Sequence, residues 1–235
     1  DLVSVLAGFT AEQLAECMTF EDVELRVVQD LKQRIVDGAG ANMDMVRTLM
    51  ARRRDGHWAN AFLASTNDRT RALAACYDAL AAAADFFKLK ATHAAGFSFV
   101  DAGTAFDQYR TELFRFDQLY RHFHTAADAV EPMGWAVLHS LRDTIEGAYS
   151  GWFIPQLSAA WAKVIEGPQG LLSHWQLPEA TPQQLFFLRK VLPLYDGGAK
   201  RVFVVISDAF RFEVAAELVQ QTNSKNRFKA SLDCM

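Results

Sequence analysis

One stretch near the C-terminal end, RVFVVISDAFRFEVAAEL at residues 201–218, constrains the fold of this chain more than any other feature. Its five apolar residues from Val202 to Ile206 follow one another without a break. A continuous run rich in β-branched residues is typical of a strand that is buried on both faces. The amphipathic pattern that follows predicts a helix from about Ala209 to Gln221. The stretch therefore indicates the strand and helix of an α/β domain.

The residues before this stretch predict a different kind of structure. From residue 1 to about 195, apolar residues recur mainly at the three- and four-residue spacings of helices. Thr19 and Asp22 resemble a capping box, which predicts a helix that ends at Asp37 and Gly38. Further helices are expected over 43–54, 67–90, 104–130 and 132–150. The helix at 104–130 carries an aromatic seam of heptad type, typical of packing against a neighbouring helix.

We therefore expect a mainly α chain with two parts. Residues 1–197 would form a multi-helix domain, and residues 198–235 would form the first β-α-β unit of an incomplete α/β domain, with a second strand at 228–232. Such a unit alone cannot bury both faces of its sheet. The chain also opens with Asp1 rather than Met and closes in mid-pattern at Met235. We expect it to be a piece of a longer protein.

The bulk composition excludes several classes of protein. The 235 residues carry a net charge of −4, so the overall charge gives no case for nucleic-acid binding, although a local basic surface stays open. The three cysteines form no CxxC pair and suggest neither a disulfide framework nor a zinc site. No apolar run is long enough to cross a bilayer, and no signal peptide opens the chain. We expect a cytoplasmic protein without a membrane partner.

Asp208 is the first candidate for chemistry, because it follows the predicted strand directly. Open α/β sheets build their sites at the carboxyl ends of strands, and a carboxylate there suits a divalent metal ion. The alternative is a structural cap, in which Asp208 accepts hydrogen bonds from the N–H groups of residues 210 and 211. The residue pattern leaves both readings open.

The other candidates favour structural interpretations. Ser207 has no neighbouring His and no nucleophile elbow around it, and Arg211 and Glu213 could simply pair with each other or with solvent. His122 and His124 are two residues apart, so they do not share a helix face. The basic cluster at 52–54 suits the C-terminal end of a helix, although a phosphate contact stays open as a minority interpretation. No Walker A, GxGxxG, HExxH or EF-hand pattern is present.

The motif at 202–218 closely resembles the opening motif of the PglZ family, a component of BREX phage-defence systems. The residues that carry this resemblance are Ser207, Asp208, Ala209, Phe210, Arg211, Phe212 and Glu213. Three further stretches are similar to the family: the aromatic-rich helix at 109–123, the segment from Tyr149 to Trp161, and residues 226–228. The resemblance is specific mainly over 200–230.

The resemblance implies an enzyme of the alkaline phosphatase superfamily, in which two divalent metals, often zinc, bind a phosphate. Asp208 then corresponds to the metal ligand that follows the first core strand. The nucleophile and the other ligands would lie beyond Met235, and Ser231 does not match the next motif. Because one carboxylate cannot hold a catalytic metal, we expect this chain to bind no metal tightly and to have no hydrolase activity of its own.

The expected function follows from these two sets of inferences. The intact protein would be a metal-dependent phosphodiesterase or phosphatase, with nucleic acid as one possible substrate, and the present chain would hold other BREX proteins. The alternative is a helical interaction module whose degenerate α/β unit never carried out chemistry. A third interpretation, a nucleotide or sensor domain with Asp208 on a ribose or magnesium, lacks the glycine-rich loop that such sites use.

Overall fold

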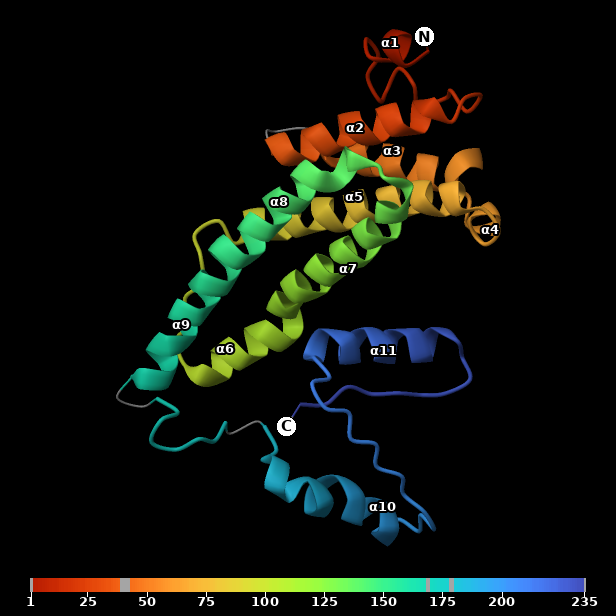
Figure 1. The fold of residues 1–235 in the computed structure, drawn as a ribbon. Helices are drawn as coiled ribbons and strands as arrows, with labels where there is room; N and C mark the ends of the chain where they lie inside the picture. Colours follow the sequence, from red (N-terminus) through yellow and green to blue (C-terminus); the bar gives the residue numbers. More distant parts are fainter. Residues whose placement is uncertain (1, 39–42, 168–169, 178–179, 235) are drawn as a thin grey trace. The chain divides into compact units, whose positions relative to one another are not determined.

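The computed structural model describes residues 2–38, 43–167, 170–177 and 180–234, and all of its regular elements in these residues are helical (Figure 1). This confirms the prediction of a mainly α fold. The chain divides into two compact units. The first unit comprises Asp1–Gly96 with Phe116–Pro155, and the second comprises Phe97–Arg115 with Gln156–Met235. The predicted boundary at residue 197 remains a prediction.

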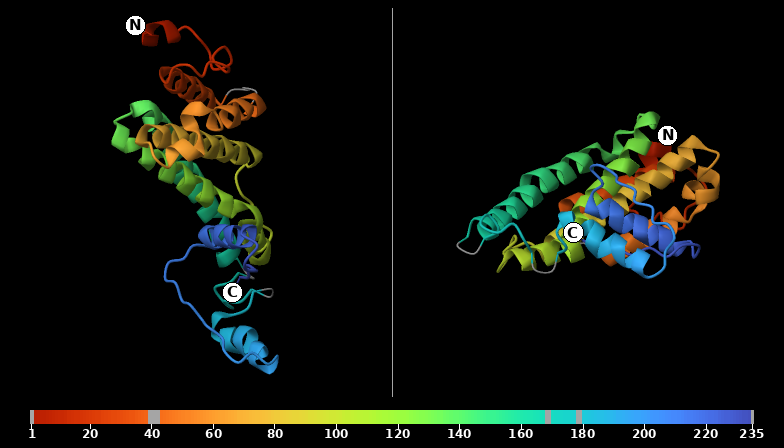
Figure 2. Two further views of the ribbon diagram at one scale, coloured as in Figure 1. Left: turned by 90° about the vertical axis from the view of Figure 1, so that its right-hand side faces the viewer. Right: turned by 90° about the horizontal axis from the view of Figure 1, so that it is seen from below.

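The first unit is built around one long helix, α5 (Asp68–Thr92), which packs against α2 (Asp22–Asp37) and α3 (Met43–Arg54) (Figures 1 and 2). Asn67 caps α5, because its side chain accepts a hydrogen bond from the backbone N–H of Thr70. The remaining elements of this unit are α1 (Leu2–Leu6), η1 (His57–Ala59), α4 (Ala61–Ala64), α7 (Phe114–Val130), η3 (Glu131–Met133), η4 (Ala136–Leu138), α8 (His139–Ala148) and η5 (Tyr149–Phe153).

The aromatic seam forms part of the core of the first unit. Phe116 stacks on Phe153 with ring centroids 4.4 Å apart and meets the ring of Phe86 edge-on at 5.4 Å. All three rings are fully buried. Phe153 ends η5, a π-helical turn, which is a feature that the sequence did not predict. The burial supports the interpretation of the seam as a packing surface rather than a platform for stacking bases.

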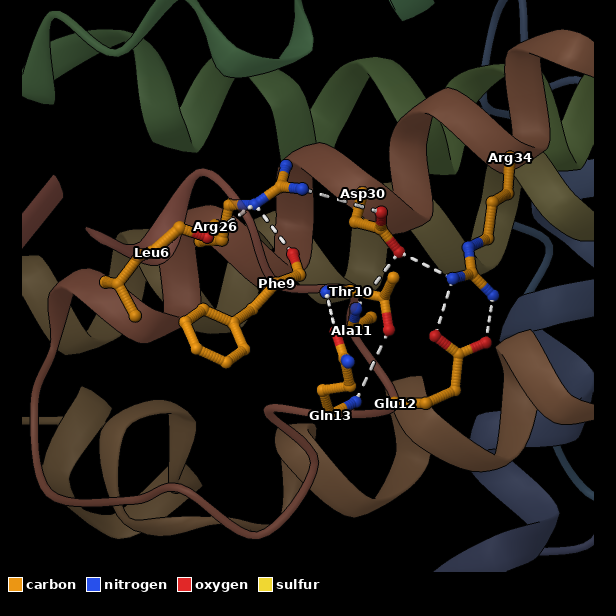
Figure 3. Close-up of polar contacts among 9 residues, drawn as sticks. All are labelled: Leu6, Phe9, Thr10, Ala11, Glu12, Gln13, Arg26, Asp30 and Arg34. Atoms are coloured by element: carbon orange, nitrogen blue, oxygen red, sulfur yellow. Dashed lines mark hydrogen bonds and ion pairs between the residues drawn. The ribbon is translucent and has the colours of Figure 1, made fainter. Parts of the chain in front are cut away.

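Side chains of α2 hold the N-terminal segment in place (Figure 3). The Nε of Arg26 donates to the carbonyl oxygens of Leu6 and Phe9 at 3.2 and 3.1 Å. Asp30 accepts from the backbone N–H of Ala11 at 3.1 Å, and Arg34 forms a two-bond ion pair with Glu12. These contacts give an irregular segment defined hydrogen-bond partners.

The predicted capping box at the start of α2 is absent. The helix begins at Asp22, its N-cap is Glu21, and no side chain makes a capping hydrogen bond there. Thr10 and Gln13 make the reciprocal pair instead, because the Gln13 side chain accepts from the N–H of Thr10 and the Thr10 hydroxyl accepts from the N–H of Gln13. The prediction for the end of α2 is confirmed, since Gly38 has a φ of 58°.

Arg53 has a role that its position in the basic cluster did not reveal. Its side chain is fully buried and is paired with the fully buried carboxylate of Glu24. Its Nη1 donates to the carbonyl oxygens of residues 14, 15 and 17 at 3.3, 3.2 and 2.9 Å. Tyr77 donates its hydroxyl proton to the same Glu24. Attraction to the helix dipole is therefore an incomplete explanation for this residue.

The second unit contains shorter elements. They are α6 (Ala102–Gln108), η2 (Tyr109–Leu113), α9 (Ile154–Glu166), η6 (Gln183–Leu185), η7 (Phe187–Val191), α10 (Leu192–Asp196) and α11 (Phe212–Ser224). Within this unit, Phe212 packs against Phe114 and Tyr109 at centroid distances of 5.2 and 6.2 Å. Phe99 meets Trp161 at 6.1 Å. Aromatic contacts thus hold the start of α11.

The two strands of the predicted β-α-β unit are not confirmed. Residues 201–207 and 228–232 are irregular, and only the intervening helix α11 forms, beginning at Phe212 rather than Ala209. Phe203, Val205 and Ile206 are 84%, 89% and 90% exposed. A strand requires a neighbour that pairs with its backbone, and none of the described residues provides one for this segment. The apolar run at 202–206 therefore has no paired strand among the described residues.

The helices in the described part of the chain include none that combines the length and the apolar character required to span a membrane.

Candidate functional site at residues 207–213

Asp208 lies on the surface, in a turn between the apolar run and α11. Its Oδ1 accepts a hydrogen bond from the backbone N–H of the next residue, Ala209, at 3.0 Å. The N-cap position of α11 belongs to Arg211, and no side chain caps this helix. The structure therefore does not show the capping role that was the alternative explanation for Asp208.

The backbone at this turn is strained. Ala209 has a φ of 55°, in the left-handed region that favours glycine. A non-glycine residue held in this region costs about 1–3 kcal/mol, and such residues cluster at active sites and ligand-binding segments. The strained backbone makes this turn a candidate functional segment, independently of the residue pattern.

The residues around Asp208 differ in exposure. Ser207 and Arg211 are exposed, whereas Glu213 in the first turn of α11 is 1% exposed. Ser231 is exposed as well. A buried carboxylate near the positive end of a helix benefits from the helix dipole. Glu213 therefore supports the start of α11 rather than offering an open ligand.

The donor set at this turn fits a metal only in part. The carboxylate of Asp208 is the hard oxygen ligand that a divalent cation accepts, but the described residues contain no group of three or more His, Cys, Asp or Glu that could hold an ion. One carboxylate does not make a metal site. The role of Asp208 as a metal ligand stays a prediction, and no chemical step can be derived from this turn alone.

The histidines do not contribute to this turn. His122 and His124 lie on α7, and the Nε2 of His124 is buried 3.8 Å from the Oε2 of Glu146. Burial is the main cause that lowers the pKa of His124, with a smaller contribution from Arg142. This side chain belongs to the packing of the first unit, as the sequence pattern favoured.

A basic loop after α11 was missed at the sequence level. Lys225 is the C-cap of the helix, and Arg227 and Lys229 follow at every second residue. All three side chains are exposed, and no ion pair joins them to an acidic group among the described residues. Residues 199–235 hold six Lys or Arg against four Asp or Glu, although the whole chain is acidic. The alternating spacing was the available signal.

Comparisons with known proteins connect this region to a family. Residues 186–235 match the PglZ family, described as the BREX system PglZ alkaline phosphatase-like domain. Both Asp208 and the basic loop lie inside the matched segment. No solved structure matches the chain.

Two curated relatives extend the similarity beyond this segment. The chain is 36% identical over 221 residues to the alkaline phosphatase-like protein BrxZ of Escherichia coli O9:H4 (strain HS), an alignment that covers 93% of this chain and 24% of that protein. It is 34% identical over 128 residues to the alkaline phosphatase-like protein PglZ of Bacillus cereus (strain H3081.97), covering 54% of this chain and 14% of that protein.

The chain thus spans about a quarter of the length of the E. coli relative, and the similarity covers its helical region as well as the matched domain segment. The motif at 207–213, the domain match and the two relatives agree. The chain belongs to the PglZ family of BREX-associated alkaline phosphatase-like proteins.

Proposed function

We propose that this chain comprises the helical region and the first segment of the alkaline phosphatase-like domain of a PglZ-type protein, and that Asp208 is one metal ligand of its hydrolytic centre. The observation that carries this proposal is the turn at 207–209. An exposed carboxylate sits there beside a strained backbone, inside the segment that matches the domain. Neither helix capping nor an ion pair in the described residues explains that arrangement.

The chemistry assigned to the intact protein is the hydrolysis of a phosphate ester. A divalent metal, with zinc as the first candidate, would bind the phosphate and increase the acidity of the attacking hydroxyl or water. Asp208 would contribute one negatively charged oxygen to hold that metal. Because catalytic sites use about three or more protein ligands, we propose that residues 1–235 alone neither bind zinc tightly nor hydrolyse phosphate esters.

The exposed apolar run supports the same assignment. Residues 202–206 are apolar on both alternating faces, yet residues 203–206 are exposed. A strand of this composition is stable when sheet neighbours and helices cover it. We assign the covering elements to further strands of the same domain, because the match to that domain includes this run and the relatives are several times longer than the chain.

The helical region supports a second role, as a scaffold for other BREX proteins. The core of the first unit is closed around buried residues of α2, α3 and α5, and none of these residues belongs to the matched domain segment. This part of the chain can therefore present a stable surface whatever the state of the metal centre. The three cysteines of the whole chain are free thiols, which suits the reducing cytoplasm in which such an assembly would work.

The test compares the full-length protein with residues 1–235. Zinc content is measured by elemental analysis, and hydrolysis is measured with bis-p-nitrophenyl phosphate. In the full-length protein, Asp208→Asn should lower metal affinity by about tenfold or more, because even residues that only support a ligand have effects of that size. Asp196→Asn is the matched control, since it removes an exposed carboxylate from the same unit.

The expected result is hydrolysis by the full-length protein and none by residues 1–235. Unchanged zinc content and rate in Asp208→Asn would refute the assignment of the ligand. Tight zinc binding with hydrolysis by residues 1–235 would refute the proposal that the centre needs further residues. The scaffold role is tested by pull-down of purified BREX proteins on residues 1–235. Asp208→Asn should leave their capture unchanged, and failure to capture any of them contradicts that role.

A further inference from the structure

The basic side chains of the first unit and those of the loop after α11 have opposite environments. In the first unit most arginines are paired with acids, as in Arg34 with Glu12, Arg47 with Asp85, Arg52 with Glu16, Arg53 with Glu24, Arg54 with Asp78, Arg69 with Glu21 and Arg142 with Asp128. Lys225, Arg227 and Lys229 have no such partner in the part of the chain that the structure describes. Their charges are available to an external anion.

The loop that carries these charges is closed by two hydrogen bonds. The Nδ2 of Asn223 donates to the carbonyl of Ala230 at 2.9 Å, and the backbone N–H of Ala230 donates to the Oδ1 of Asn223 at 2.8 Å. Inside the loop, Asn226 adopts a left-handed φ of 53°, which asparagine tolerates better than most residues. The three cations are therefore presented on an ordered backbone, so less entropy is lost when they bind.

An aromatic residue stands between two of the cations in the sequence. Phe228 is 73% exposed and separates Arg227 from Lys229 in the chain. Cations beside an exposed aromatic side chain are the combination that binds single strands, because the cations contact phosphates while an unstacked base packs on the ring. A duplex offers the phosphates but keeps its bases stacked.

We propose that residues 225–229 form a binding loop for single-stranded nucleic acid, with Lys225, Arg227 and Lys229 on the phosphate backbone and Phe228 against a base. Attraction to the C-terminal end of α11 accounts for Lys225, but Arg227 and Lys229 lie beyond the helix. The loop and Asp208 lie in the same matched segment, so the loop would position a phosphodiester substrate. Only this link to hydrolysis rests on the proposed function, since binding itself does not.

The test measures the binding of a fluorescent oligothymidylate to residues 1–235 by anisotropy at several salt concentrations. The triple variant Lys225→Ala, Arg227→Ala and Lys229→Ala should bind about tenfold more weakly or worse, and the slope of log affinity against log salt should decrease by about 2, the value for three phosphates on a single strand. Phe228→Ala should weaken binding by about fivefold or more, with the same salt slope as the parent.

The matched control replaces three exposed cations elsewhere, Lys88→Ala, Lys163→Ala and Arg189→Ala. Circular dichroism should show the same helix content in all variants. The proposal is overturned if the control weakens binding as much as the loop variant, or if the loop variant binds like the parent. Binding of phosphatidylserine vesicles through the same residues, without binding of the oligonucleotide, also overturns it in favour of a lipid surface.

The full-length protein separates this inference from the proposed function. Asp208→Asn should lose zinc and hydrolysis of the small reporter and retain oligonucleotide binding, whereas the loop variant should lose oligonucleotide binding and keep its zinc content. Unchanged zinc content and hydrolysis in Asp208→Asn would refute the proposed metal ligand alone. Unchanged oligonucleotide binding in the loop variant would refute the binding loop alone.

Discussion

The helical first unit and the segment 186–235 differ in the burial of their apolar side chains and in the pairing of their arginines. In the first unit, core side chains such as Leu31 and Phe116 are buried, and the fully enclosed Arg53 is paired with an acid. In the segment 186–235, apolar side chains such as Phe203 and Ile206 are exposed, and Arg227 has no acidic partner among the described residues. In the first region these groups have partners within the unit. In the second region they lack such partners among the described residues, so they are free to contact other molecules.

This difference separates stability from function within one chain. A region whose polar and apolar groups are satisfied internally gains stability from each of them. A region that leaves them unsatisfied gains little, and residues that do not stabilise the fold are the best candidates for binding. The comparison can be tested with pairs of variants, one member in each environment.

The largest effect is expected at Arg53. Arg53→Ala leaves the carboxylate of Glu24 buried without its cation and removes one donor from each of three carbonyl oxygens, so it should lower the free energy of unfolding by about 3–5 kcal/mol. Arg52→Ala removes the neighbouring, exposed pair with Glu16 and should cost about 1 kcal/mol or less. Urea denaturation measures both. Equal losses would show that the burial of Arg53 contributes nothing.

A smaller effect is expected from trimming apolar side chains. Leu80 is fully buried on α5, and Leu80→Ala should cost about 3 kcal/mol through lost contacts and a cavity. Val205 is 89% exposed, and Val205→Ala should change stability by about 0.5 kcal/mol or less. Thermal and urea unfolding of residues 1–235 give both values. In the full-length protein the Val205→Ala variant should become destabilising, and a neutral result there would contradict the assignment of a covered strand.

The smallest effect is expected from the surface pair of Glu12. The hydrogen bonds and charge of Arg34 lower the pKa of Glu12 from 4.5 to about 2. Because the folded-state pKa is the lower one, the stabilisation is complete above pH 4.5 and is lost as the pH falls toward 2. The pair is partly exposed, so its contribution should be about 1 kcal/mol or less.

Glu12→Gln is the variant that checks this pH dependence. Free energies of unfolding are measured at pH 7, 4 and 3. The wild type should have the larger value at pH 7, and the two values should converge as the pH falls. High salt should reduce the difference at pH 7 as well. A constant difference across the pH range would show that the charge of Glu12 is not the cause.

The helices were largely predictable because their signals are local. The apolar spacing at 67–90 predicted α5, and Gly38 predicted the end of α2. The capping box predicted at Thr19 and Asp22 was wrong, since α2 begins at Asp22 with Glu21 as its N-cap and without a capping side chain. Likewise, α11 starts three residues later than its apolar periodicity suggested, because Ala209 takes a left-handed conformation that no helix contains.

The candidate site was predictable only where one residue type carries the signal. Asp208 was chosen by its place after an apolar run, and its role stays a prediction. The strands are not confirmed among the described residues, because a strand is stabilised by partner strands that are often distant in sequence. The burial of Arg53 was not predictable from its neighbours, since Arg52 and Arg54 look identical locally and yet are not fully buried. The loop at 225–229 was overlooked because the net charge of the chain conceals a local excess.

The bonding of Arg53 has a consequence for how this protein can vary. Its guanidinium binds main-chain oxygens of residues 14, 15 and 17, and every amino acid carries such an oxygen. Side chains in that segment can therefore change without loss of these bonds, provided that they fit their surroundings. Adding or deleting a residue would shift the oxygens out of reach. The segment 14–17 should therefore tolerate amino-acid substitutions far better than insertions or deletions.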